Sequence, residues 1–335
     1  GKRFGLEIVN PILSNGVFSG KPNNLNGTHV YKLDDPIIEL LFNNNTLLSK
    51  NKFRHSYPHC WRHKTPLIYR ATPQWFISMS KNNLLSNVIK KTSDVNWIPL
   101  WGEARIKGML EGRPDWCISR QRKWGVPITL LINKKTGEPH SNSSIIFSRI
   151  CKLVEEYGIE KWFDIDIEEL IDNPEDYEKV QDTLDVWFDS GSSHSAVLEK
   201  KPQLSFPADL YLEGSDQHRG WFQSSLITSV AVCNEPPYKA AMTHGFTVDA
   251  KGNKMSKSKG NVIAPQKIID RLGSDILRLW VASTDSSSEM NVSEEILNRT
   301  SDKYRKIRNT IKFLLSNIAD YDPTHLSNQS ITIEL

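Results

Sequence analysis

The stretch that decides the fold is DLYLEGSDQHRGWFQSSLITSVAVCNEPPYKAAMT, residues 209–243. Its first residues, Asp209–Leu212, have the pattern of a buried strand. A helix is expected over Gln217–Val232, because the preceding Ser215-Asp216 pair is typical of a helix cap. Ala240–Thr243 supplies a second strand. Strand, helix and strand in this order predict a βαβ unit with a right-handed crossover, and therefore an α/β fold built on a parallel sheet.

A basic loop, KGNKMSKSKG at residues 251–260, follows this unit. Its glycines permit unusual backbone angles, and its lysines supply point charges. Serine hydroxyls and backbone N–H groups add hydrogen-bond donors. This combination suits a triphosphate, on which charge shifts during group transfer. The alternative from composition alone is a solvated basic turn.

Local signals place the elements upstream of this unit. The sequence Asp34-Asp35-Pro36 predicts a helix start, with an apolar face supplied by Ile37–Leu41. A short helix is expected over Glu103–Glu111, ending at Gly112. These elements precede the βαβ unit without forming any visible internal repeat.

Two other regions differ in character from the βαβ unit. Residues 130–132 and a turn at 134–137 predict a hairpin, and the acidic segment 129–180 that contains it is interpreted as an inserted subdomain. Beyond residue 275 the chain is expected to be helical. A short helix is expected at 276–283 and an amphipathic helix at 304–318, where apolar residues recur at spacings of three and four.

Composition excludes several classes of protein. The 335 residues carry 42 Lys and Arg against 39 Asp and Glu, so bulk charge neither requires nor excludes nucleic acid. No apolar run reaches the roughly 18 residues of a membrane-spanning helix. No C-x-x-C pair is present, and no metal site is predicted, even for His59-Cys60 and the nearby His63. Free thiols favour a reducing, cytoplasmic compartment.

The order Lys-Met-Ser-Lys-Ser at 254–258 resembles the signature loop of class I aminoacyl-tRNA synthetases. Other stretches resemble the isoleucyl-tRNA synthetase family, and QHRGWF at 217–222 separates that family from its valine and leucine relatives. The resemblance covers nearly the whole chain in family order, and it is weakest at 129–180 and at the two ends. The other matching stretches are HSYP (55–58), CWRHKTP (60–66), RATPQWF (70–76), RPDWCISRQR (113–122), DTLDVWFDSG (182–191), LEGSD (212–216) and THGFTVD (243–249).

This resemblance implies the second half of a Rossmann-type, parallel-sheet nucleotide-binding core, with the end of an inserted editing domain before it and a helical region after it. The class motif His-x-Gly-His is expected upstream of Gly1, because none of the nine histidines belongs to one. The chain is therefore interpreted as an internal fragment that is inactive alone. The implied domains are the editing part at 1–75, the core at 76–275 with an insertion at about 129–180, a stem-contact region at 276–322 and the start of an anticodon-binding region at 323–335.

The resemblance also implies binding roles for residues of the βαβ unit. Glu213 would contact the aminoacyl-adenylate, and Gly214 would let the backbone approach it. Asp216 and Gln217 are favoured as helix caps by the residues alone, and the resemblance adds a contact with the adenylate for both. Ligands bind at the carboxyl ends of the strands in open α/β sheets, which agrees with these positions.

Further roles concern the isoleucine side chain and ATP. Trp187 and Trp221 would flank the side chain, although a lone tryptophan is more often a core residue. Lys257 and Lys254 are expected to act on the phosphates in catalysis, with Lys257 the more direct of the two. The expected ATP-binding residues are Lys254, Ser256, Lys257, His244 and Gly245.

A hydrolytic editing site is also expected from the resemblance. A hydrophobic pocket gains only about 1–3 kcal/mol from one methylene, a discrimination already documented for isoleucine against valine in this class of enzyme. The stretch VYKLDD at 30–35 resembles the part of the editing domain whose aspartate holds the ammonium of the wrong amino acid, which points to Asp35. Without the resemblance, Asp34 and Asp35 are interpreted as helix caps. Family members commonly have Asn where this chain has Asp34.

The implied reaction activates isoleucine with ATP and Mg²⁺ and transfers it to tRNA(Ile), with hydrolysis of mischarged valine. A monomer without membrane contact is expected, and zinc only in a C-terminal part of the family outside this chain. The alternatives are a valyl-tRNA synthetase or a non-catalytic RNA-binding module. Arg305, Arg308 and Lys312 form a basic face on the last helix, which would meet RNA or simply be solvated.

Overall fold

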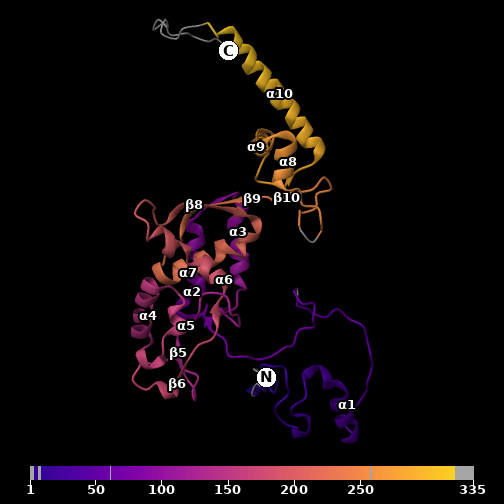
Figure 1. The fold of residues 1–335 in the computed structure, drawn as a ribbon, viewed down its shortest axis with the longest axis vertical. Helices are drawn as coiled ribbons and strands as arrows, with labels where there is room; N and C mark the ends of the chain where they lie inside the picture. The colour runs from indigo at the N-terminus through magenta and orange to yellow at the C-terminus, as the bar shows by residue number, and fades with distance from the viewer. Residues whose placement is uncertain (1–3, 7–8, 61, 257–258, 321–335) are drawn as a thin grey trace. The chain divides into compact units, whose positions relative to one another are not determined.

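The structure, a computed structural model, describes residues 4–6, 9–60, 62–256 and 259–320. The chain divides into two compact units, residues 1–75 and 76–335, and each has a hydrophobic core of its own. Figure 1 labels the elements along the chain. No helix in the described part is both long and apolar enough to cross a lipid bilayer.

The first unit contains the helix α1 (Asp34–Asn43). Leu25 and Leu33 are buried in its small core. The predicted helix is confirmed, but its N-cap residue is Leu33, and neither aspartate forms a side-chain capping bond. Asp34 and Asp35 lie in the first turn instead, where their negative charges face the positive end of the helix dipole.

A parallel sheet forms the centre of the second unit. Its strands lie in the order β2 (Asn96–Ile98), β9 (Tyr238–His244) and β8 (Ala208–Gly214). Strands β8 and β9 pair in parallel, and the helix α7 (Trp221–Cys233) connects them along the chain. The predicted βαβ unit and the α/β fold class are therefore confirmed.

Helix α7 begins later than the sequence predicts. Residues Ser215–His218 form a 3-10 turn, η9, and Gly220 interrupts the helical backbone with φ −109° and ψ −117°. The Trp221 N–H donates to Gln217 Oε1 at 2.9 Å, so Gln217 closes the N-terminus of α7 from outside the helix. The prediction of a helix start at Gln217 is wrong because this glycine separates the turn from the helix.

Helix α7 is buried along most of its length, and every residue over 222–230 is buried. It packs against α6 (Val186–Gly191) and α2 (Leu84–Lys91). A Cβ atom on Gly191 would lie 3.1 Å from the backbone of Ser224. Glycine at this position lets α6 approach α7 closely.

Short elements surround this core. The predicted helix before Gly112 is confirmed as α3 (Trp101–Glu111). The strand β1 (Phe76–Ile77) pairs antiparallel with β3 (Trp116–Cys117). The strand β4 (Ser119–Arg120) pairs antiparallel with β7 (Thr183–Leu184). The second pair brings residues before and after the acidic segment together.

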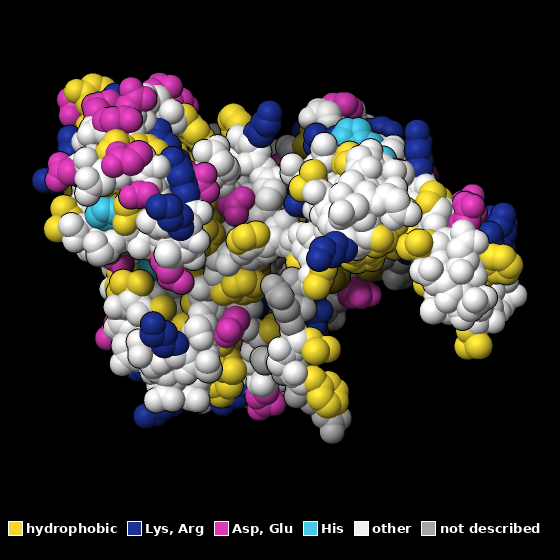
Figure 2. All heavy atoms as spheres, turned by 90° about the horizontal axis from the view of Figure 1, so that it is seen from below, with side chains coloured by type: hydrophobic (Ala, Val, Ile, Leu, Met, Phe, Trp, Pro, Cys, Tyr) yellow, Lys and Arg dark blue, Asp and Glu magenta, His cyan; other side chains and the backbone are white. Residues whose placement is uncertain are grey.

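The acidic segment has its own hydrophobic cluster and two helices, α4 (Ser143–Tyr157) and α5 (Lys161–Asp164). Acidic side chains gather on the lobe at the left of Figure 2. The predicted hairpin is confirmed: after the turn at 134–137, Ile132 of the strand β5 (Leu131–Asn133) bridges antiparallel to Pro139, and the Asn133 N–H donates to the Glu138 carbonyl at 2.9 Å. The main partner of β5 is β6 (Tyr177–Lys179), which returns from the far end of the segment.

The last part of the second unit is mostly helical. It contains α8 (Pro265–Leu272), α9 (Ser274–Ala282) and α10 (Glu294–Asn317). A short parallel pair joins two segments of this part. Its strands are β10 (Thr247–Val248), which lies before α8, and β11 (Met290–Asn291), which lies between α9 and α10. The prediction of α9 is confirmed, whereas α8 was not expected and α10 begins well before the predicted start.

Candidate active site

The parallel strands β8 and β9 end side by side. Gly214 is in register with His244, and Glu213 is in register with Thr243. The exposed Glu213 carboxylate accepts the Gly214 N–H at 3.3 Å. His244 Nδ1 lies 2.8 Å from the carbonyl oxygen of Gly245. The sheet therefore brings four predicted residues to the edge where ligands bind in open α/β folds.

Two glycines at this edge have neighbours too close to leave room for a Cβ atom. A Cβ on Gly214 would lie 2.9 Å from Asp216 Oδ1, which also shows that Asp216 lies beside the end of β8. A Cβ on Gly245 would lie 2.0 Å from the carbonyl oxygen of Ser288. Because that oxygen belongs to the backbone, it cannot move aside as a flexible side chain can. Position 245 therefore requires glycine.

The two predicted pocket tryptophans lie around the first turn of α7. Trp221 stacks on Tyr211, with ring centroids 4.0 Å apart and 11° between the ring planes. Its Nε1–H donates to the Ser190 carbonyl at 3.0 Å. Trp187 packs on the backbone of Gly220, where a Cβ would lie 2.9 Å from its ring. The indoles from α6 and α7 are thus fixed at the same helix terminus.

A cavity of about 190 Å³ opens beside Trp187. The sequence did not point to two of its lining residues, Arg113 and Gln223, which share a hydrogen bond from Arg113 Nη1 to Gln223 Oε1. Burial lowers the pKa of Arg113, and the charge of Asp185 opposes this shift. Among described residues, Arg113 Nε and Gln223 Nε2 have no hydrogen-bond partner. The cavity is lined by Arg113, Trp116, Asp185, Trp187, Arg219, Gly220, Gln223 and Ser224.

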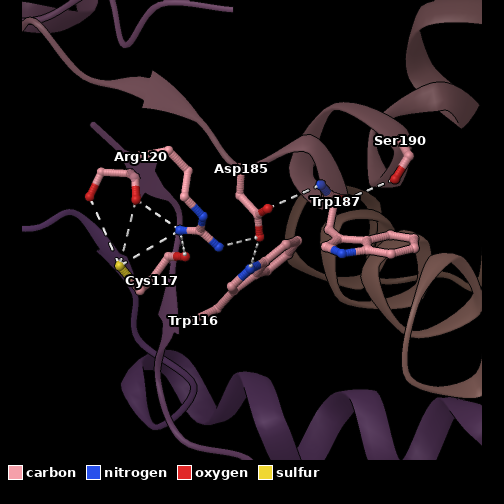
Figure 3. Close-up of polar contacts among 7 residues, drawn as sticks. Trp116, Cys117, Arg120, Asp185, Trp187 and Ser190 are labelled. Atoms are coloured by element: carbon pink, nitrogen blue, oxygen red, sulfur yellow. Dashed lines mark hydrogen bonds and ion pairs between the residues drawn. The ribbon is translucent and has the colours of Figure 1, made fainter. Parts of the chain in front are cut away.

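Asp185, at the wall of this cavity, bonds to β3, to β4 and to the start of α6, as Figure 3 shows. Its carboxylate accepts Trp116 Nε1–H at 3.1 Å and the backbone N–H of Trp187 at 3.3 Å. It also pairs with Arg120, whose Nη2 lies 3.0 Å away. The bond to Trp187 caps α6. A single buried carboxylate therefore fixes the backbone of Trp187, and the sequence did not single it out.

The same carboxylate affects Asp189, one turn further along α6. Burial raises the pKa of Asp189, and the negative charge of Asp185 raises it further. Both effects favour the neutral form of this side chain relative to a solvated aspartate. Asp185 itself pairs with Arg120, whereas Asp189 has no ion pair among the described residues.

The basic loop is closed at its base by Asp249. The Asp249 carboxylate accepts the backbone N–H groups of Lys251 and Asn253, each at 2.9 Å. It also accepts the side-chain amide of Asn261 at 3.0 Å. These bonds, led by the one from Asn261, lower the pKa of Asp249 to about 2. An ionised carboxylate thus ties the two ends of the loop together.

Within this loop, Lys254 Nζ lies 3.4 Å from the centroid of the Phe246 ring. The Ser256 N–H donates to Asn261 Oδ1 at 2.9 Å. Lys257 lies outside the described residues. The structure therefore describes two of the three predicted phosphate-binding residues of the loop, Lys254 and Ser256. Lys254 is held by the Phe246 ring, and Ser256 is held by Asn261.

Asp35 belongs to the first unit and lies in the first turn of α1. Its side chain is 91% exposed, and Oδ1 lies 3.5 Å from Lys50 Nζ. These are the contacts of a surface residue at a helix N-terminus. The editing role of Asp35 stays a prediction.

His218 lies behind the site and is fully buried, with its ring stacked on Trp97 at 5.9 Å between centroids. Its Nδ1 lies 3.1 Å from the Ser215 carbonyl, so Nδ1 carries the proton that this bond requires. Burial lowers the pKa of His218 from its ordinary value of 6.5. The neutral ring is therefore the form that packs against the start of α7.

This lowered pKa predicts a loss of stability in acid. The unfolded chain binds more protons than the folded chain once the pH falls below about 6.5, so the free energy of unfolding decreases there. We expect His218→Gln to flatten this decrease in urea titrations at about pH 7.5, 6.5 and 5.5. His194, also buried with a lowered pKa, accounts for part of the remaining slope. An unchanged slope in the variant would contradict the prediction.

The sequence was compared with known protein families and curated proteins. The family described as tRNA synthetases class I (I, L, M and V) matches residues 21–293. The isoleucine–tRNA ligase of Idiomarina loihiensis is 55% identical over 324 residues, which make up 96% of this chain and 34% of that protein. The isoleucine–tRNA ligase of Saccharophagus degradans is 56% identical over 322 residues, with the same coverage. The chain spans about a third of the length of these curated relatives.

A solved structure of Mycobacterium tuberculosis methionyl-tRNA synthetase bound by methionyl-adenylate is also similar. It covers 72% of this chain and 40% of its own chain, at 18% identity and a TM-score of 0.45.

Proposed function

The chain belongs to the class I tRNA synthetases of the I, L, M and V group, and we propose that it supplies the second half of the catalytic core of an isoleucine–tRNA ligase. The complete enzyme would activate isoleucine with ATP and then transfer it to tRNA(Ile). The observation that carries this proposal is the meeting of Glu213, Gly214, His244 and Gly245 at the carboxyl ends of β8 and β9. The indoles of Trp187, on α6, and Trp221, on α7, both lie at the N-terminus of α7, the helix that connects these two strands.

In the proposed activation step, a carboxylate oxygen of isoleucine attacks the α-phosphorus of ATP and pyrophosphate leaves. The exposed Glu213 carboxylate would hold the substrate ammonium or a ribose hydroxyl, and Asp216 beside Gly214 would add a second acceptor. Gln217 Oε1 already accepts the Trp221 N–H, so its amide nitrogen is the group proposed to contact the adenylate. Positioning and fixed charges, rather than a covalent enzyme intermediate, would carry catalysis.

The phosphates of ATP are assigned to the basic loop in this proposal. Lys254 and Ser256 are held by the loop base described above, and Lys257 lies between them and Gly260 in the sequence. Lysine charges would stabilise the pyrophosphate as negative charge grows on it. His244 and Gly245 would lie beside the adenine. Mg²⁺ is proposed to accompany ATP and to share the charge of its phosphates.

The remaining assignments concern the wider enzyme. We propose a cytoplasmic monomer that hydrolyses mischarged valine, with Asp35 holding the ammonium of the wrong amino acid. The basic residues of α10 are proposed to lie near tRNA. Arg305 already pairs with Asp302 at 3.1 Å, so Arg308 and Lys312 are the better candidates for contact with phosphate.

The pocket assignment predicts a selective effect of Trp221. Replacing Trp221 with alanine removes one apolar wall, so the isoleucine KM is expected to rise at least about tenfold. The KM for ATP is expected to change by less than about twofold, because the indole lies at α7 rather than at the basic loop. The measurement is isoleucine-dependent exchange of pyrophosphate into ATP by an enzyme of the relatives' length that contains this chain.

Trp221→Phe is the matched control, since it keeps an aromatic ring beside Tyr211 and loses the Nε1–H bonds to the Ser190 carbonyl and the Ser193 hydroxyl. It is expected to retain most of the isoleucine affinity. Gln217→Ala tests the adenylate contact in the same assay. The pocket assignment fails if neither Trp221→Ala nor Gln217→Ala alters isoleucine-dependent exchange.

A further inference from the structure

An exposed tryptophan lies in the loop between β4 and residue 126. The loop, Gln121–Gly125, has the sequence Gln-Arg-Lys-Trp-Gly. Trp124 is 94% exposed, and it is the most exposed tryptophan in the described part of the chain. An exposed indole offers a flat apolar face on which another ring can stack, and its N–H remains available as a hydrogen-bond donor. None of the roles assigned above accounts for this residue.

The loop is anchored on both sides by the same segment. Residues of β4 pair with β7 on one side, and on the other side the Leu184 N–H donates to the Val126 carbonyl at 2.7 Å. The Ile128 N–H donates to the Asp182 carbonyl at 3.0 Å. Gly125 has φ +146°, and a Cβ there would lie 3.1 Å from the Thr183 side chain. The indole is therefore presented to solvent by a well-bonded base.

Two basic residues stand next to this tryptophan in the sequence. Arg122 and Lys123 precede it directly, and neither forms an ion pair with any residue that the structure describes. Arg120 at the base of the loop is paired with Asp185. A flat exposed ring beside unpaired cations suits an unpaired nucleotide, whose base stacks on the ring while its phosphates meet the cations.

The base of the loop is joined to the proposed amino acid pocket. Arg120 Nη2 lies 3.0 Å from the Asp185 carboxylate, which accepts the Trp187 N–H (Figure 3). Transfer of an activated amino acid requires a ribose hydroxyl at the end of tRNA to reach the adenylate. Only unpaired nucleotides can enter a pocket of this kind, so they must pass close to its walls.

We propose that Trp124, together with Arg122 and Lys123, stacks on and holds an unpaired nucleotide of the acceptor end of tRNA. This inference rests on the proposed function and assigns a part of the RNA partner to a particular loop. It predicts that the loop acts in transfer, whereas amino acid activation needs no RNA and proceeds without it.

The test compares Trp124→Ala with Trp124→Phe in an enzyme of the relatives' length that contains this chain. Trp124→Ala is expected to lower kcat/KM for tRNA charging by about tenfold, and Trp124→Phe is expected to retain most of it. Isoleucine-dependent pyrophosphate exchange is expected to change by less than about twofold. Phe147→Ala, which removes an aromatic side chain that is 50% exposed on α4, is the matched control and is expected to charge normally.

A second arm identifies the part of tRNA. Binding to intact tRNA is expected to weaken about tenfold in Trp124→Ala, whereas tRNA trimmed of its unpaired 3′ nucleotides is expected to bind wild type and variant equally. Unchanged charging by Trp124→Ala, or equal weakening for trimmed tRNA, would overturn the proposal. Absence of isoleucine-dependent exchange in the wild type would instead refute the proposed function, and the two binding measurements would still test the loop.

Discussion

Replacing Lys257 with alanine is expected to slow isoleucine-dependent pyrophosphate exchange by about 100- to 1,000-fold, the usual effect of removing one fixed donor from a developing negative charge. The lysine is assigned to the phosphates of ATP, where charge grows on the leaving pyrophosphate. Its contribution is larger in the transition state than in the bound substrate. The decrease is therefore expected in kcat as well as in kcat/KM for ATP.

Lys259→Ala is the matched control for this prediction. Lys259 lies in the same basic loop, but it is outside the Lys-Met-Ser-Lys-Ser order, so exchange is expected to fall by less than about threefold. Binding of tRNA by Lys257→Ala is expected to stay within about twofold of wild type. A non-catalytic RNA-binding module would show the opposite pattern, with RNA affinity reduced and no exchange reaction to lose.

Replacing Asp185 with alanine is expected to lower the free energy of unfolding by about 3 kcal/mol. The side chain is 7% exposed, and its loss leaves the Trp116 indole N–H without its acceptor and α6 without its cap. Arg120 is 40% exposed and can turn to solvent, so the ion pair itself contributes only part of this effect. Urea denaturation of wild type and variant measures the difference.

Two variants separate the causes of this effect. Asp185→Asn keeps an oxygen acceptor for the Trp187 N–H or for Trp116 and loses the charge, so a smaller decrease of about 1 kcal/mol is expected. Asp209→Ala removes a surface ion pair in which the Asp209 side chain is 80% exposed and the Lys239 side chain is 60% exposed. It is expected to change the free energy of unfolding by less than about 0.5 kcal/mol. A similarly small change in Asp185→Ala would contradict the central role of this carboxylate.

The βαβ unit could be predicted from the sequence because local patterns decide it. The strand residues before Glu213 and the long apolar run of α7 are contiguous in the chain, and their connection leaves only a parallel arrangement. The order of the motifs likewise predicts that the adenylate binds at the end of β8. The placement of Gly214 beside His244, and of Glu213 beside Thr243, follows from the register of the adjacent parallel strands.

Other features depend on contacts that no local pattern encodes. The start of α7 is set by the backbone of Gly220 and by the bond from Trp221 to Gln217, whereas the cap-like Ser215-Asp216 pair placed it too early. The Arg113–Gln223 bond joins residues 110 positions apart. The strand β5 also pairs with β6, which lies far away in the chain, and both contribute side chains to one hydrophobic cluster, whereas the sequence predicted only the nearer hairpin.

Asp185 shows the same limit within the candidate site. Its position before α6 is compatible with an ordinary helix cap, and that bond is present. Its contacts with Trp116 and Arg120 arise only when β4 and β7 pair. Asp185 therefore caps α6 locally, and through its tertiary contact with Arg120 it also connects the pocket residue Trp187 to the base of the Trp124 loop.

The most direct test of the proposed activity is pyrophosphate exchange into ATP by an enzyme of the relatives' length that contains this chain, measured with isoleucine, valine, leucine, methionine or no amino acid. Exchange is expected to require an amino acid and to be fastest with isoleucine. Valine is expected to be about 10- to 200-fold poorer in kcat/KM, the range that one missing methylene permits and one already documented for this class of enzyme. Exchange that is absent with isoleucine, or faster with valine, leucine or methionine, would contradict the proposed activity.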